Sequence, residues 1–348
     1  MTHELAPLKT VTVMGATGNQ GGAVVRSLVQ NKSFKVRGVT RDPSSKASRD
    51  LVALGVEVVK ADGWKEEEIT TAFAGSWAAF VNTNSDDPRF MDAEGPTEFE
   101  LGKTIIDGII KTATVEHLIY SSAVSTSAYS GGVVKAKTTE MKSEIERYAV
   151  NTGYFETFCP VFAGFYMELF ASKDMARVFG GFPFFPDENG VTTLCTPRWG
   201  TEKDMPAGWI AVREDFGDIV HGVLTEPEKY HKKGVEALSD ACSFPDVASC
   251  FQSVTGKKTQ YVCHPSCETY GAEIEREHPA GLPSLEDTRG LFRFGQLSNA
   301  KYFGDLPTDT AVPARLKARA FEAMGKDPKE ANLFTLKQWF ENNFQIHK

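Results

Sequence analysis

The sequence predicts an α/β protein built on a doubly wound parallel sheet, and three observations support this prediction. Its 348 residues are enough for a large α/β domain with a smaller appended one. In the first half, short apolar runs alternate with segments of helical length. A glycine-rich turn directly follows the first apolar run. Strands separated by helices pair in parallel through right-handed crossovers, which places a ligand at the carboxyl ends of the strands.

The elements of the first half follow from this alternation. Apolar, β-type runs predict strands at 11–14, 35–40, 56–60, 77–82, 117–122 and 155–159. Periodic segments between them predict helices at 21–30, 46–54, 66–74, 97–112 and 138–152.

The pattern changes after residue 160, so we predict a dinucleotide-type domain over 1–160 and a smaller substrate-side or partner-side domain over 161–348, with some strands returning to the main sheet. Phe and Gly are dense in 162–185, which fits either the wall of an apolar pocket or plain core packing. Further strands are predicted at 208–212 and 234–238, and helices at 214–224 and 329–344.

Composition restricts the class of protein. Hydrophobic residues make up 41% and charged residues 24%, an ordinary globular balance without a run long enough to cross a membrane. The formal net charge of −8 argues against direct binding to nucleic acid or to an anionic membrane. A protein partner remains compatible with it.

The cysteines and the first residues indicate the compartment. Six cysteines are scattered without a disulfide-like framework or zinc-site spacing, which predicts reduced thiols and no metal site. A short polar lead precedes the first strand and lacks the pattern of a targeting peptide. We therefore expect a cytoplasmic protein, which a regulatory role would also take to the nucleus. The sequence does not define its oligomeric state.

The glycine-rich turn is the strongest functional motif. It reads Gly15, Ala16, Thr17, Gly18, Asn19, Gln20 and Gly21, and it lies between the first strand and the first helix. Glycine at these positions lets the backbone approach a pyrophosphate, and the helix that follows directs its N–H groups at the phosphates. In this context the motif predicts a Rossmann-type dinucleotide site.

The end of the second strand selects between the cofactors. Sites for NAD usually carry Asp or Glu there, to bind the ribose 2′-hydroxyl. This chain has Thr40 followed by Arg41, and Lys46 begins the next helix. A guanidinium can bind a 2′-phosphate in bidentate fashion, so the pattern favours NADP(H). The alternative is a solvated Arg41 neutralised by Asp42.

Polar residues at two further strand ends complete the expected site. Asp62 follows the third strand and could hydrogen-bond the adenine amine, although a solvated turn explains it almost as well. Asn82, Thr83 and Asn84 end the fourth strand, where backbone runs along the ribose and nicotinamide; turn chemistry also favours these residue types.

These motifs resemble the NmrA-like family, atypical members of the short-chain dehydrogenase/reductase superfamily. The likeness covers nearly the whole chain, through segments 15–28, 36–43, 117–123, 141–153, 209–220, 225–240 and 335–344. It implies NADP(H) binding through Gly15, Gly18, Gly21 and Arg41, and a substrate-side domain in the second half.

Ordinary members of that superfamily use Tyr-x-x-x-Lys on a helix, in which Lys lowers the pKa of a phenol that transfers the substrate proton. The matching Lys here is Lys142, and Thr138 stands in the tyrosine position. Tyr129 lies too far upstream for that helix face. Standard tyrosine catalysis is therefore not expected.

A second resemblance offers another role for the lysine. The isoflavone-reductase-like branch is similar around Lys142, with a basic residue and a glycine at the spacing of Arg147 and Gly153. In that branch the lysine itself is the acid/base group; the alternative is a lysine that only hydrogen-bonds the ribose. The resemblance also implies that Ser122, at the fifth strand's end, orients a carbonyl, whereas a polar strand end is the simpler interpretation.

Two functions follow. The first is an oxidoreductase that transfers hydride between NADPH and a small apolar carbonyl, enone or similar metabolite, with Lys142 as proton donor or acceptor and Ser122 orienting the oxygen. The second is a catalytically inactive sensor that reports the NADPH/NADP⁺ ratio to a transcription factor or enzyme. The lysine favours the first function, and the absent tyrosine favours the second. A relic that does neither is the third possibility.

Overall fold

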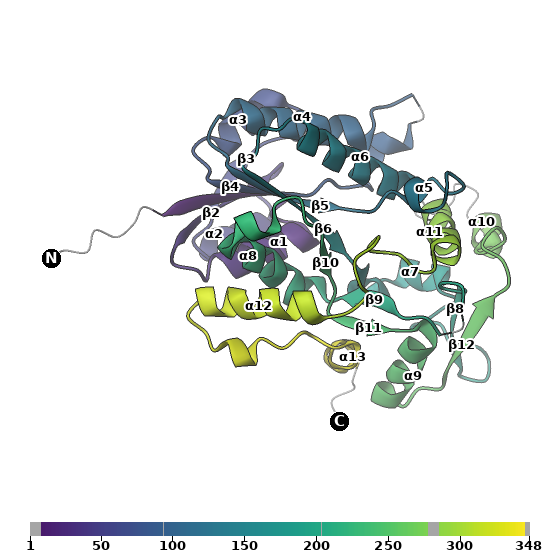
Figure 1. Ribbon diagram of the computed structural model, residues 1–348. Coiled ribbons are helices and arrows are strands. Elements are labelled where there is room, and N and C mark those ends of the chain that lie inside the picture. Colours follow the sequence, from purple (N-terminus) through teal and green to yellow (C-terminus); the bar gives the residue numbers. More distant parts are fainter. Residues whose placement is uncertain (1–7, 93, 203, 278–284, 345–348) are drawn as a thin grey trace.

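A seven-stranded parallel sheet forms the centre of the molecule (Figure 1). The computed structural model describes residues 8–92, 94–202, 204–277 and 285–344. The strand order is β10-β6-β5-β4-β1-β2-β3. Its strands are β1 (Lys9–Met14), β2 (Phe34–Thr40), β3 (Glu57–Lys60), β4 (Ala78–Val81), β5 (His117–Ser122), β6 (Thr157–Ala163) and β10 (Val235–Ala237). This is the predicted Rossmann-type architecture, and the fold class is confirmed.

Helices cover both faces of this sheet (Figure 1). One face carries α1 (Asn19–Leu28), α8 (Gly217–Thr225) and α12 (Ala311–Ala323). The other carries α3 (Glu66–Phe73), α4 (Glu98–Lys111) and α6 (Lys137–Asn151), while α2 (Lys46–Ala53) joins β2 to β3. None of the helices in the described ranges is long and apolar enough to cross a lipid bilayer.

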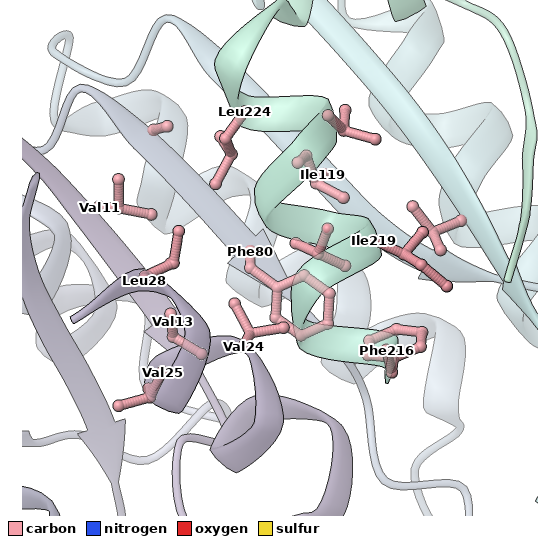
Figure 2. Close-up of a cluster of buried hydrophobic side chains, with 14 of the residues drawn as sticks. Val11, Val13, Val24, Val25, Leu28, Phe80, Ile119, Phe216, Ile219 and Leu224 are labelled. Atoms are coloured by element: carbon pink, nitrogen blue, oxygen red, sulfur yellow. The ribbon is translucent and has the colours of Figure 1, made fainter. Parts of the chain in front are cut away.

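The core beneath the first helix is mostly aliphatic, with Phe80 and Phe216 among its members, and it is buried. Figure 2 shows Val24 and Leu28 of α1 packed between β1 and Ile219 of α8. The two helices approach closely at Gly217, where a Cβ would overlap the Ala23 backbone. Close packing of this kind fixes the position of α1, and with it the turn at its N-terminus.

The second half both extends the main sheet and forms a smaller unit. Strand β10 pairs in parallel with β6, as expected for a returning strand. The smaller strands are β7 (Phe165–Tyr166), β8 (Thr192–Pro197), β9 (Ala207–Ile210), β11 (Asp240–Cys242) and β12 (Thr259–His264). The further helices are α5 (Thr126–Tyr129), α7 (Lys173–Val178), α9 (Phe244–Thr255), α10 (Ala272–Glu277), α11 (Leu285–Ser298) and α13 (Leu336–Phe344). All six cysteines are free thiols.

One expectation for the second half needs correction. The helix predicted over 329–344 is shorter, because a 3₁₀ turn at Pro328–Glu330 precedes α13. Helices α7, α9, α10, α11 and α12 were not predicted.

Of the two alternatives for the aromatic stretch 162–185, core packing holds for most of it, because Phe170, Phe179 and Phe182 are buried in one cluster with Trp209 and Phe340. Only Ala163 and Tyr166 of this stretch line the cleft described below.

Candidate active site

A cleft of about 1060 Å³ runs along the carboxyl ends of the central strands. The segments after six strands contribute to its wall: Gly15, Arg41, Asp62, Asn82, Ser122 and Ala163. Pockets for drug-sized ligands usually hold roughly 300–1,000 Å³. The cleft therefore has room for an extended dinucleotide together with a small second molecule.

Most of the residues predicted for the site line this cleft. They are Gly15, Thr17, Gly18, Asn19, Gln20, Arg41, Asp62, Asn82, Thr83, Asn84, Ser122 and Lys142. Ala16, Gly21 and Lys46 do not line it. Ala16 is buried against Gly38 beneath the turn, and Gly21 lies behind it in α1.

The glycine turn is shaped by backbone contacts. Gly15 has a φ of +67°, a conformation that side chains rarely adopt. A Cβ on Gly21 would overlap the carbonyl of Gly15. Gly18 caps α1 without a side-chain hydrogen bond, so the positive end of the helix faces the cleft. The turn thus provides a cradle in which backbone amides meet an anion.

The cationic side chains at the end of β2 differ in position. Arg41 is 62% exposed, and its Nη1 lies 3.4 Å from Oδ2 of Asp87. Asp42, the neutralising partner considered from sequence, instead accepts hydrogen bonds from Ser44. Lys46 is 83% exposed and pairs with Asp50 at 2.7 Å, away from the cleft wall. Arg41 is therefore the cation of this pair that can meet an adenosine phosphate.

The loop after β3 is linked to the loop after β4. Oδ2 of Asp62 lies 3.7 Å from Nη2 of Arg89, and Oδ1 accepts the backbone N–H of Trp64. Asp62 is thus held at the cleft edge with part of its carboxylate exposed, where it could also accept from an adenine amine.

The ammonium group of Lys142 contacts four protein oxygens. Its Nζ lies 2.9 Å from the Thr83 carbonyl, 3.1 Å from Thr83 Oγ1 and 2.9 Å from Oε1 of Glu98. Oδ1 of Asn82 is more distant, at 3.4 Å. Since an ammonium has three protons, these contacts use its donors and fix the loop after β4. The carboxylate of Glu98 is buried and balances the charge.

Thr138 occupies the position at which ordinary members of the superfamily carry the catalytic tyrosine. Its hydroxyl donates to Oδ2 of Asp287 in α11. The same carboxylate accepts the backbone N–H of Lys137 at 2.9 Å and of Thr138 at 3.3 Å. Asp287 therefore caps the N-terminus of α6 from a distant segment and draws α11 against the cleft. Tyr129 lies outside the cleft wall and donates to Asp305.

Ser122 is paired with a carboxyl group that the sequence did not reveal. Its hydroxyl donates to Oε2 of Glu146 at 2.5 Å. Glu146 follows Lys142 by one turn of α6 and does not line the cleft. Burial raises the pKa of Glu146, and the hydrogen bond from Ser122 opposes this rise.

Two tyrosines of the cleft wall were also missed. Tyr166 and Tyr302 both line the wall, and burial raises the pKa of each phenol. Nε2 of Gln20 donates to the Tyr166 hydroxyl at 2.5 Å. Oε1 of Gln20 is buried without a partner, so it can accept from a bound ligand. No local motif connects these residues, which lie far apart in the sequence.

A fully parallel sheet, a glycine turn before α1 and a cleft at the carboxyl strand ends define a protein of the Rossmann class. Residues 7–295 match the NmrA-like family. The NmrA-like family domain-containing oxidoreductase cpsB of Aspergillus campestris is 59% identical over 99% of this chain and 100% of its own length. The corresponding notA of an Aspergillus species is 50% identical over 96% and 97%. The chain belongs to the NmrA-like family.

Solved structures share the fold at low identity. NmrA, a negative transcriptional regulator in complex with NADP, has a TM-score of 0.71 at 19% identity, over 97% of this chain and 95% of that one. A triphenylmethane reductase from Citrobacter, complexed with NADP(H), has a TM-score of 0.67 at 17% identity, over 96% and 100%.

Proposed function

We propose that this protein is an NADP(H)-dependent oxidoreductase that transfers hydride between NADPH and a small, largely apolar carbonyl- or enone-type metabolite. The observation that carries the proposal is one continuous cleft, which joins the glycine turn and Arg41 to Lys142 and Ser122. The relatives named as NmrA-like oxidoreductases, alike over nearly their whole length, support it.

The residues present fit this cofactor. Gly15, Thr17 and Gly18 would hold the diphosphate. The glycines have no Cβ, so the cradle stays open and the phosphates could approach the backbone amides. Arg41 would bind the 2′-phosphate, and Asp62 the adenine. Gln20 offers an unpartnered buried acceptor. When bound, the cofactor supplies the hydride.

The other end of the cleft would take the substrate. Ser122 and the phenols of Tyr166 and Tyr302 combine polar groups with apolar area, and Leu291 of α11 adds an aliphatic wall. A small molecule with one polar group would fit this lining. We infer that Lys142 holds the loop after β4, which would run along the cofactor ribose, since its donors already meet Thr83 and Glu98.

Cofactor choice can be measured by fluorescence titration. NADPH should bind at least tenfold more tightly than NADH, a difference of about 1.4 kcal/mol. Arg41→Ala should remove most of that difference. Lack of affinity for both nucleotides would refute the cofactor site, and equal affinities in the wild type would refute the NADP preference.

Turnover can be measured as NADPH consumption with a panel of carbonyls and enones. Activity of the wild type would support the enzyme. Lys142→Ala then separates the two roles of the lysine: loss of turnover with cofactor affinity kept assigns proton transfer, and loss of both assigns support of the loop and ribose.

A redox sensor is the second candidate function, and Thr138 favours it. The superfamily's phenol is absent, and its position serves instead to bind α11 through Asp287. Such a sensor would change its affinity for a regulatory protein between NADPH and NADP⁺. No turnover with any substrate, together with a partner that distinguishes the two nucleotides, would support this function, in the cytoplasm or the nucleus.

A further inference from the structure

Reduction of a carbonyl needs a proton as well as a hydride, and the lysine at the cleft is poorly placed to give one. Its ammonium donates to the Thr83 carbonyl, Thr83 Oγ1 and Glu98. Transfer of one of these protons to a ligand would leave the buried Glu98 carboxylate without its cation.

Ser122 offers a hydroxyl group to a ligand in the cleft. It lies at the carboxyl end of β5, lines the cleft and is 5% exposed. Its proton is directed at Oε2 of Glu146, at 2.5 Å. The serine lies in the cleft wall and the carboxyl group does not, so the serine hydroxyl connects the carboxyl group to the cleft.

The groups around Glu146 leave it free to exchange a proton. Arg147, exposed on the same helix, is the cation that acts on it. Tyr120 of β5 lies on the sheet face that α6 covers and Cys159 of β6 lies on the opposite face, and burial raises the pKa of both. Neither of these neighbours therefore ionises near neutral pH. Burial also raises the pKa of Glu146, so its acid form persists to a higher pH than that of an exposed glutamate.

We propose that Ser122 and Glu146 form a proton relay that opens into the cleft; this rests on the proposed oxidoreductase function and names its proton source. The substrate carbonyl carbon accepts the hydride that NADPH supplies, and the C=O π pair moves to oxygen. That oxygen takes the proton of Ser122 while Ser122 takes one from Glu146. An alcohol and a Glu146 carboxylate result, and solvent returns the proton.

The protonation state of Glu146 also sets what Ser122 offers to a ligand. A carboxylate at Glu146 accepts the serine proton, so the serine oxygen faces the cleft as an acceptor. A carboxylic acid at Glu146 donates to the serine, whose proton then points into the cleft. Reduction is thus favoured below the pKa of Glu146, and oxidation above it.

The first test needs no cofactor and no substrate. Infrared difference spectra of the purified protein, recorded across a pH titration, report the carbonyl band of each protonated carboxyl group. Glu146→Gln should remove one titrating band that persists above the ordinary range of glutamate, near pH 4.3. Ser122→Ala should shift that band, whereas Glu144→Gln, the matched control on the same helix, should leave it unchanged. A spectrum that Glu146→Gln leaves intact would overturn the relay.

The second test uses the pH profile of turnover. Wild-type reduction should fall as pH rises through the Glu146 titration. Glu146→Gln should lower kcat about 100-fold and remove that limb, with KM for NADPH unchanged, and Glu146→Asp should restore part of both.

Three outcomes distinguish the possible failures. Turnover whose profile survives Glu146→Gln would overturn the relay and leave the oxidoreductase standing. Loss of the limb in Tyr166→Phe instead would assign the proton to the phenol and also overturn the relay. No turnover with any substrate would overturn both proposals.

Discussion

The two ends of the cleft are built in different ways. At the glycine end, Gly15, Gly18 and Gly21 shape a cradle of backbone, and the nearby Arg41 is largely exposed. At the other end, side chains hold one another: Lys142 with Glu98, Ser122 with Glu146, and Thr138 with Asp287. The first end depends on open space beside the backbone, and the second depends on pairs of side chains. Substitutions should therefore act differently on the two ends.

The largest effect should come from breaking the buried ion pair of the side-chain end. Lys142→Met leaves the Glu98 carboxylate buried without its cation and should lower the free energy of unfolding by about 3 kcal/mol. Urea denaturation measures it. The double variant Lys142→Met/Glu98→Gln should recover most of the loss, and equal loss in both variants would contradict the assigned pairing.

The glycine end should instead respond to one added methyl group. Gly21→Ala places a Cβ against the Gly15 carbonyl and should weaken NADPH binding about 100-fold, or about 2.7 kcal/mol. Fluorescence titration gives the affinity and thermal unfolding checks the fold. In the control Gly22→Ala the nearest atom belongs to the flexible Arg26 side chain, so binding should persist. Normal binding in Gly21→Ala would refute the cradle.

Acid should weaken the contact between α8 and the C-terminal end of α1. His221 is fully buried between Ser27 and Asn31, and burial lowers its pKa to about 4. The unfolded chain takes up a proton below pH 6.5 while the folded one does not, so stability is lost as pH falls from 6.5 towards 4. The loss should reach about 2 kcal/mol by pH 5.

Thermal unfolding at pH 7 and pH 5 tests this, because His221→Gln should show a smaller loss than the wild type. Burial raises the pKa of the adjacent Asp218, which acts in the opposite direction. A wild-type stability that does not change over this interval would contradict the assignment.

A smaller effect is expected where α11 meets the cleft. Asp287→Asn weakens the charged cap on α6 and should cost about 1 kcal/mol, because the backbone donors of Lys137 and Thr138 lose a carboxylate. Hydrogen exchange should rise in α11 and in the first turn of α6. Glu286→Gln, exposed on the same helix, should not change it. Unchanged exchange in Asp287→Asn would show that the cap does not hold α11.

The smallest effect should be that of Lys46→Ala. Lys46 was predicted to assist Arg41, but it points into solvent and pairs with Asp50. NADPH affinity should therefore stay within experimental error of the wild type in a fluorescence titration. A tenfold loss would show that this side chain reaches the cofactor after all.

The glycine end of the cleft could be predicted from the sequence because the residues that form it lie close together in the chain. The glycine spacing, the strand before it and Arg41 all lie within one β-α-β unit, and such short-range patterns also predicted the sheet. The sequence did not predict that Glu98, Glu146 and Asp287 hold side chains of the site. Their partners lie 44, 24 and 149 residues away in the chain, and only the folded sheet brings them together.

The sequence left two interpretations of the aromatic stretch 162–185 open for a related reason. Phe-rich, Gly-interrupted sequence fits a pocket wall and a core equally well, and partners as distant as Trp209 and Phe340 decide between them. Helix α12 was not predicted from the sequence. Its apolar residues pack on α8, and this contact between distant segments forms only in the folded protein.

Strand β10 can join the sheet only late in synthesis. Val235 is synthesised more than seventy residues after the end of β6. Until then the outer edge of β6 has no β10 strand with which to pair. Helix α12, which covers α8, arrives later still. During that interval the nascent first half presents an unpaired strand and uncovered apolar surface, the features that invite aggregation and chaperone binding. A fragment ending at residue 163, the last residue of β6, would keep both permanently.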